Sequence, residues 1–164
     1  MRATAATTIA APIDTVWGVV SDPEQALSFM SGVTRWEVES EEPQGVGARY
    51  RMLLRVGSAE VGGLIEVVEW SPPRELAWTS ITGVDQRGRW RLRRLSENRT
   101  RVEIRLAAGV PGSGVPGWVA ERIAQPIVAR HLKASVAQLA KRVELERMRS
   151  QAAGRRAART TAAG

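Results

Sequence analysis

The sequence predicts an α+β domain in which an antiparallel sheet of six or seven strands packs against one long C-terminal helix. Six segments between residues 33 and 108 alternate apolar and polar side chains over strand-like lengths, and only short turns separate them. The segment from Val115 to about Met148 repeats apolar residues at helical spacing instead. Because an amphipathic helix cannot bury its own apolar stripe, we expect it to cover the dry face of the sheet.

The N-terminal segment is expected to form one strand and two short helices. Small and β-branched residues predict the strand over Arg2 to Ile9. The first helix starts near Pro12, since proline is favoured in a first helical turn, and the second covers Glu24 to Met30. Ser31-Gly32 ends the second helix.

The next part of the chain predicts six strands in a meander. The alternation is clearest where Trp90 and Leu92 are interleaved with arginines. Gly62-Gly63 lies inside one strand and indicates a bend or a close approach by another group. The expected strands cover residues 33–41, 48–56, 59–70, 75–81, 85–95 and 100–108.

The long helix should bury one apolar face, and Pro126 should kink it because proline removes a backbone donor. The residues expected against the sheet are Val128, Leu132, Val136 and Leu139. Residues 149–164 are rich in Arg and Ala and have no periodic apolar stripe, so we expect a disordered tail after a domain that spans residues 1–148.

Composition limits the classes of function. Four arginines and no acid lie in residues 149–164, so the first 148 residues carry +3 of the net +7, and we expect no nucleic-acid partner. Cysteine is absent and histidine occurs once, which predicts no disulfide, no metal site and no cofactor. No run is apolar enough for a membrane span, and the N-terminus lacks the pattern of a secretory signal. We expect a cytoplasmic protein that is a monomer or a weak dimer. Transient contact with a membrane surface is compatible with this composition.

The opening Ile9–Asp22 follows the pattern I-x-A-x-x-x-x-V-W-x-x-(V/L)-x-D, and further characteristic blocks lie at residues 45–50, 67–78 and 99–102. In these blocks the sequence resembles the START-like (SRPBCC) superfamily, in its polyketide cyclase/dehydrase-like branch. The resemblance covers about residues 2–146. It implies a helix-grip fold, in which a curved sheet grips the long helix around an apolar cavity.

Strand parity and helical spacing then predict which side chains face this cavity. From the sheet these are Trp36, Tyr50, Met52, Ile65, Trp78, Trp90 and Leu92, and from the helix Ile123, Ile127 and His131. Indole walls suit a flat or greasy ligand. We therefore expect binding or transport of a small hydrophobic molecule such as a lipid, a quinone or a polyketide-like compound; the bland alternative is that most of the tryptophans are plain core residues.

Two other functions remain open from the sequence. A polyketide cyclase or dehydratase needs a general acid/base beside the ligand, for which His131, Tyr50 and Glu69 are the candidates. The third alternative is a partner-binding module that uses the arginine stripe of residues 87–93 or the basic tail.

Overall fold

The computed structural model describes residues 1–109 and 117–163, and the side chains of the last helix from Arg122 onwards. Within these residues, seven strands form one antiparallel sheet in the order β1-β7-β6-β5-β4-β3-β2, which confirms the predicted fold class. The strands are β1 (Arg2–Ile9), β2 (Val33–Val38), β3 (Arg49–Val56), β4 (Ala59–Ser71), β5 (Glu75–Ser80), β6 (Gln86–Ser96) and β7 (Arg99–Ala108).

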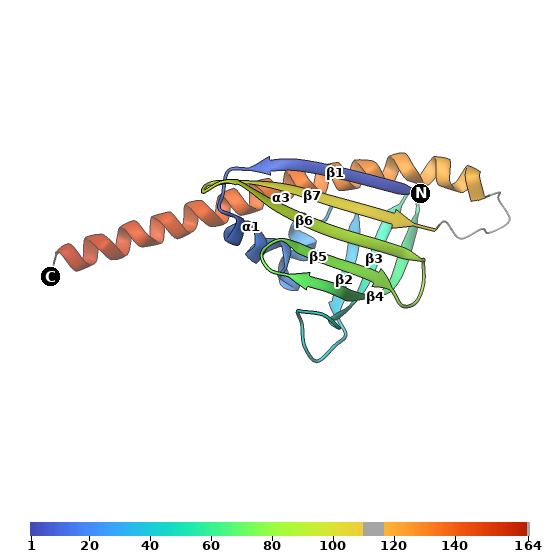
Figure 1. Ribbon diagram of the computed structural model, residues 1–164, viewed down its shortest axis with the longest axis horizontal. Helices are drawn as coiled ribbons and strands as arrows, with labels where there is room; N and C mark the ends of the chain where they lie inside the picture. The colour runs from blue at the N-terminus through green and yellow to red at the C-terminus, as the bar shows by residue number, and fades with distance from the viewer. Residues whose placement is uncertain (110–116, 164) are drawn as a thin grey trace.

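The first strand lies at the opposite edge of the sheet from the second. Between them the chain forms α1 (Ile13–Val20), the 3-10 turn η1 (Pro23–Gln25) and α2 (Ala26–Phe29), which carry it across one face of the sheet. Strands β2 to β7 then form the predicted meander, and β7 pairs with β1 over Arg2↔Ala107 to Ile9↔Thr100. The helices and the curved sheet thereby enclose the interior from both sides (Figure 1).

The last helix, α3 (Gly117–Ala162), lies along β1 and covers the same face of the sheet as α1 and α2 (Figure 1). Val128, Leu132, Val136 and Leu139 are all buried, as the helical spacing predicts. Pro126 lies inside the helix. The expected start at Val115 falls outside the described residues.

The structure of the C-terminal tail differs from the prediction of disorder. We expected disorder from residue 149, but α3 continues to Ala162 and projects from the domain with its side chains exposed (Figure 1). Ala and Arg are among the strongest helix formers, and adding residues to an existing helix avoids the cost of nucleation. Near the point where α3 leaves the domain, Arg147 donates to the carbonyl of Ala10 at 2.6 Å and to Asn98 Oδ1 at 3.3 Å. Local propensity therefore keeps the projecting turns helical without tertiary contacts.

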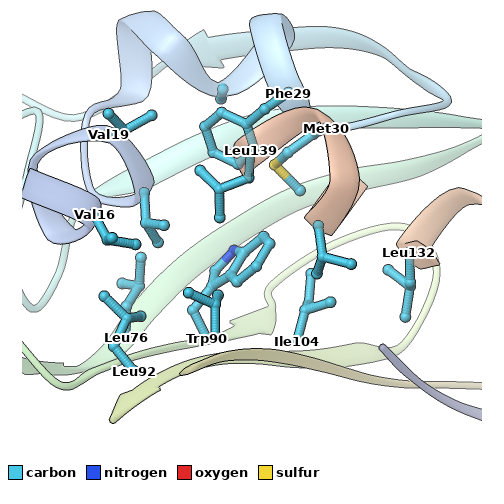
Figure 2. Close-up of a cluster of buried hydrophobic side chains, with 14 of the residues drawn as sticks. Val16, Val19, Phe29, Met30, Leu76, Trp90, Leu92, Ile104, Leu132 and Leu139 are labelled. Carbon is cyan, nitrogen blue, oxygen red and sulfur yellow. The ribbon is translucent and has the colours of Figure 1, made fainter. Parts of the chain in front are cut away.

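The densest part of the core lies under α1 and α2. Figure 2 shows Trp90 surrounded by side chains from both helices, from α3 and from the neighbouring strands. The Trp90 ring meets Phe29 edge to face, with centroids 6.0 Å apart and an interplanar angle of 71°. Leu92 and Leu139 are also fully buried here. Buried apolar side chains from the helices and the strands therefore pack closely around Trp90 at this end of the sheet-helix interface.

Gly62 and Gly63 mark a close approach of three backbone segments. A Cβ atom at Gly62 would lie 2.0 Å from the carbonyl oxygen of Met52, and one at Gly63 would lie 2.1 Å from that of Thr82. Neither position has room for a side chain, so β4 can bend tightly between β3 and the β5–β6 turn.

Candidate functional site

Three apolar cavities lie between the sheet and the helices, and we name each by its lining. The largest, the N-terminal cavity, has a volume of about 110 Å³ and is lined by Met1, by the ends of β3, β4, β6 and β7, and by α3. Leu54, Val61 and Leu106 form much of its wall, and Ala124 and Val128 close it from the helix. Among the described residues of this lining, Gln86 alone has a polar side chain, so the cavity suits an apolar molecule.

Two smaller cavities continue the N-terminal cavity toward the core. The middle cavity, of about 30 Å³, shares Met52, Leu54, Leu106 and Val128 with the N-terminal cavity. The tryptophan cavity, of about 20 Å³, lies beneath α1, η1 and α2 and shares Met30 and Trp78 with the middle cavity. The three cavities therefore form a row in which neighbouring cavities share lining residues.

The predicted ligand residues divide among these cavities. Met52 borders the N-terminal and middle cavities, and His131 borders the middle cavity. Leu92 is buried in the core around Trp90 and lines none of the three. The residues that line the tryptophan cavity are Trp36, Tyr50, Ile65, Trp78 and Trp90.

The helix side of the site needs a correction. Ile123 is 61% exposed and Ile127 is half-buried, and neither lines any of the three cavities. Ala124 and Val128 take the expected place, because the buried face continues toward the N-terminus from Val128 in steps of four residues. That spacing identifies Ala124, but alanine is only weakly hydrophobic, so the prediction favoured the larger neighbouring Ile123.

Tyr50 and Trp36 form an ordered wall of the tryptophan cavity. Their rings stack with centroids 5.0 Å apart and an interplanar angle of 25°. The Tyr50 hydroxyl donates a hydrogen bond to the carbonyl of Pro43 at 2.5 Å. Burial raises the pKa of the Tyr50 phenol to about 12, because the charged phenolate would lose its hydration. At neutral pH this group is a fixed, neutral hydroxyl.

His131 joins α3 to the segment after α2 and to the end of β3. Its Nε2 lies 3.0 Å from the carbonyl oxygen of Arg55, to which it must donate, and its Nδ1 lies 3.3 Å from Ser31 Oγ. A Cβ atom at Gly32, where φ is +79°, would lie 2.6 Å from the imidazole ring. Both ring nitrogens therefore have partners in the fold, and neither is left free to move a proton of a ligand.

Glu69 points to the outer face of the sheet. Its carboxylate accepts from the Arg89 guanidinium at 3.0 Å, and Arg89 also pairs with Glu75 at 2.5 Å. Glu69 lines none of the three cavities. Arg91 pairs with Glu75 too, at 3.2 Å, so carboxylates balance two of the four arginines in the stripe of residues 87–93.

In the part of the chain that the structure describes, no group of three or more His, Cys, Asp or Glu side chains could hold a metal ion. None of the helices described is both long enough and apolar enough to cross a membrane.

Solved structures share this architecture at low sequence identity. The protein TTHA0849 from Thermus thermophilus has a TM-score of 0.78 at 22% identity, over 89% of this chain and 99% of that protein. The Zhui aromatase/cyclase from Streptomyces sp. R1128 has a TM-score of 0.74 at 20% identity, over 88% of this chain and 93% of that one. A START superfamily protein from Mycobacterium smegmatis has a TM-score of 0.70 at 17% identity, over 88% of this chain and 97% of that one. These likenesses establish the helix-grip, START-like fold.

Among curated proteins, none matches this chain in sequence. A family model does match it, over residues 1–144, which include every strand and the domain-packed part of α3. The chain therefore belongs to the family described as polyketide cyclase / dehydrase and lipid transport.

Proposed function

We propose that this protein binds a small hydrophobic ligand in the row of cavities between the sheet and α3. The observation that carries the proposal is the N-terminal cavity, an apolar space of about 110 Å³ whose lining comes from strand ends, the N-terminus and one helix. Membership of a family that includes lipid transport supports it.

The ligand must displace side chains, because occupied ligand sites usually have volumes of roughly 300 Å³ or more. Met52 is one of four residues that line both the N-terminal and the middle cavity, and Met30 lines both the middle and the tryptophan cavity. Methionine has three rotatable bonds and a polarisable sulfur, so it changes rotamer at low cost and packs well against varied shapes. These two side chains are therefore the ones we expect to move when a ligand enters.

The three acid/base candidates give no comparable support to a cyclase or dehydratase. Tyr50 and His131 line different cavities, and their polar atoms already have partners in the fold. Glu69 lies on the outer face in an ion pair with Arg89. General acid/base chemistry needs such groups within hydrogen-bond reach of one ligand. We therefore propose binding without an assigned reaction.

A probe and a pair of variants test the proposal. N-phenyl-1-naphthylamine, a neutral apolar fluorophore, should bind the purified protein with enhanced emission. Ala124→Leu places a larger side chain in the wall of the N-terminal cavity and should weaken probe binding at least tenfold. Ile123→Leu, one residue away but exposed, is the matched control and should bind as the parent does.

Native mass spectrometry of the freshly purified protein, followed by extraction with organic solvent, should also detect a co-purified apolar molecule. The proposal fails if no apolar molecule is extracted and the parent protein does not bind the fluorophore. Equal binding by the Ala124→Leu and Ile123→Leu variants would place any bound probe outside the cavity.

A further inference from the structure

The tryptophan cavity contains two buried hydrogen-bond donors that lack acceptors. Nε1 of Trp36 and Nε1 of Trp78 are both inaccessible to solvent, and neither has a hydrogen-bond partner among the described residues. Both indoles line this one cavity, and Trp78 is only 5% exposed. Buried polar groups in native proteins are nearly always hydrogen-bonded, so two unpaired donors at one place require an explanation.

The fold holds both indoles in place. Trp78 on β5 lies opposite Gly88 on β6, and a Cβ atom at Gly88 would lie 1.9 Å from Cζ2 and 2.2 Å from Cε2 of the indole. The ring thus occupies the space that any side chain at position 88 would need. Trp36 is held by its stack on Tyr50, whose hydroxyl is tied to Pro43. The rings that carry the two unpaired N–H groups are therefore fixed parts of the cavity wall.

The polar neighbours in the lining are occupied elsewhere. Ser21 Oγ donates to the carbonyl of Trp17 at 2.7 Å. The Asp22 carboxylate accepts from the backbone N–H of Glu24 at 3.0 Å and from Gln25 Nε2 at 3.3 Å. Among the described residues, neither these side chains nor Tyr50, which donates to Pro43, accepts a hydrogen bond from either indole, so an acceptor from outside the protein can serve both donors.

We propose that Trp36 and Trp78 donate to a neutral oxygen acceptor, a carbonyl above all, at the leading end of the apolar ligand. This inference rests on the proposed ligand-binding function and specifies its chemistry. A carboxylate is disfavoured because the lining described for this cavity contains Asp22 and no Lys, Arg or His side chain to compensate a second negative charge. A pure hydrocarbon is disfavoured because it leaves both donors unpaired. The ligand class is thus an apolar ketone, quinone or ester rather than a fatty acid anion or an alkane.

Entry to this position requires the Met30 side chain, which lines both the tryptophan and the middle cavity, to change rotamer while the Trp78 indole stays in place. Trp78 and Met30 separate the tryptophan cavity from the middle cavity, which opens in turn toward the N-terminal cavity past Met52. In the absence of ligand, the space of about 20 Å³ is enough for one water molecule, which would serve the same donors. A ligand carbonyl would replace that water and keep its hydrogen bonds.

Three small probes of nearly one shape test the inference on the full chain. Acetophenone carries a carbonyl where ethylbenzene carries a methylene, and benzoate replaces the methyl ketone with a carboxylate. Titrations of ¹⁵N-labelled protein follow the indole N–H resonances, assigned with the Trp36→Phe and Trp78→Phe variants. Acetophenone should move the Trp36 and Trp78 indole protons downfield, as hydrogen bonding does, and ethylbenzene should not. Benzoate should bind at least tenfold more weakly than acetophenone.

The variants distinguish the contribution of the indole hydrogen bond to probe affinity from the contribution of ring shape. The ratio of acetophenone to ethylbenzene affinity should fall about fivefold in Trp78→Phe, which keeps an aromatic ring but removes the donor. Trp70→Phe is the matched control, because Trp70 packs edge to face on Trp17 and lines none of the three cavities, and it should keep the parent ratio. If Trp78→Phe does not fold, the indole shifts of the parent and the ratio in Trp36→Phe decide.

The outcomes distinguish this inference from the proposed function. If acetophenone and ethylbenzene bind equally, or the ketone leaves both indole resonances in place, the inference is overturned while ligand binding stands. If the ketone preference survives in both Phe variants, another group recognises the carbonyl and the inference is wrong. If neither acetophenone nor ethylbenzene binds while N-phenyl-1-naphthylamine does, the inference is overturned and the ligand-binding function stands; if the fluorophore does not bind either and no apolar molecule is extracted, the ligand-binding function fails.

Discussion

Gly88→Ala adds a single methyl group directly against the buried indole of Trp78. The added Cβ would lie 1.9 Å from Cζ2 of Trp78, whereas carbon atoms pack at about 3.5–4.0 Å. The indole must therefore move by about 1.5–2 Å or the β5–β6 pair must open. Trp78 is buried, and overpacking a filled site costs about 1–3 kcal/mol. For a chain of this length we expect the melting temperature to fall by about 3–10 °C.

The same movement should change ligand recognition. Trp78 borders the tryptophan and middle cavities on the inner face of the sheet, and a methyl group at position 88 should push the indole toward one of them. The preference for acetophenone over ethylbenzene should then fall in Gly88→Ala as it does in Trp78→Phe. Urea denaturation followed by tryptophan fluorescence measures the stability, and the probe titration measures the preference.

Gly18→Ala is the control for the generic effect of replacing glycine. Gly18 lies on the exposed side of α1, and a Cβ atom there meets no heavy atom within 4 Å. Alanine is the better helix former by about 1 kcal/mol, so this variant should be slightly more stable than the parent. The reasoning is refuted if Gly88→Ala is as stable as the parent while Gly18→Ala behaves as expected, because Trp78 would then not fill the space opposite Gly88.

Three further predictions follow from the burial and hydrogen bonds of single elements. Tyr50 is the only tyrosine, and burial raises its pKa from 10.0 to about 12, so its absorbance titration at 295 nm should have a midpoint near pH 12. The contribution of this group to the free energy of unfolding is present below pH 10 and is lost between pH 10 and 12. A midpoint near pH 10 would contradict the burial of the phenol. His131→Ala removes both ring-nitrogen contacts and should lower the free energy of unfolding, measured in urea, by about 1–3 kcal/mol. Lys133→Ala, at an exposed position two residues away, should change it by less than about 0.5 kcal/mol. Equal effects of the two substitutions would show that the imidazole contacts do not stabilise the fold. Deletion of residues 151–164 should reduce the helical circular dichroism signal and leave the free energy of unfolding within about 0.5 kcal/mol of the parent, and a larger loss would mean that the projecting turns contact the domain.

Local sequence determined most of the fold. A strand shows each side chain to alternate faces, so the alternation around Trp90 and Leu92 was enough to place both on the buried face. The spacing of Val128 and Leu132 likewise identified the face of α3 that meets the sheet. These patterns repeat within a few residues and do not depend on what lies opposite. The strands, their meander and the packed face of the helix were therefore predictable.

The tertiary structure decided everything that depends on partners distant in sequence. His131 finds its partners 100 and 76 residues away, at Ser31 and Arg55, and no local pattern marks these contacts. Ala124 rather than Ile123 closes the N-terminal cavity because the helix meets the sheet at one particular rotation. The pairing of Gly88 with Trp78 depends on the register of β5 against β6.

The sequence by itself thus determined which faces are apolar, because buried residues recur every two positions in a strand and every 3.6 positions in a helix. Only the tertiary structure decided how completely those faces fill the interior. Cavity volume is the small difference between the space that the backbone encloses and the side chains that occupy it, and it depends on rotamers and register throughout the domain. For the same reason, the two unpaired indole donors of Trp36 and Trp78 come together only in the folded chain.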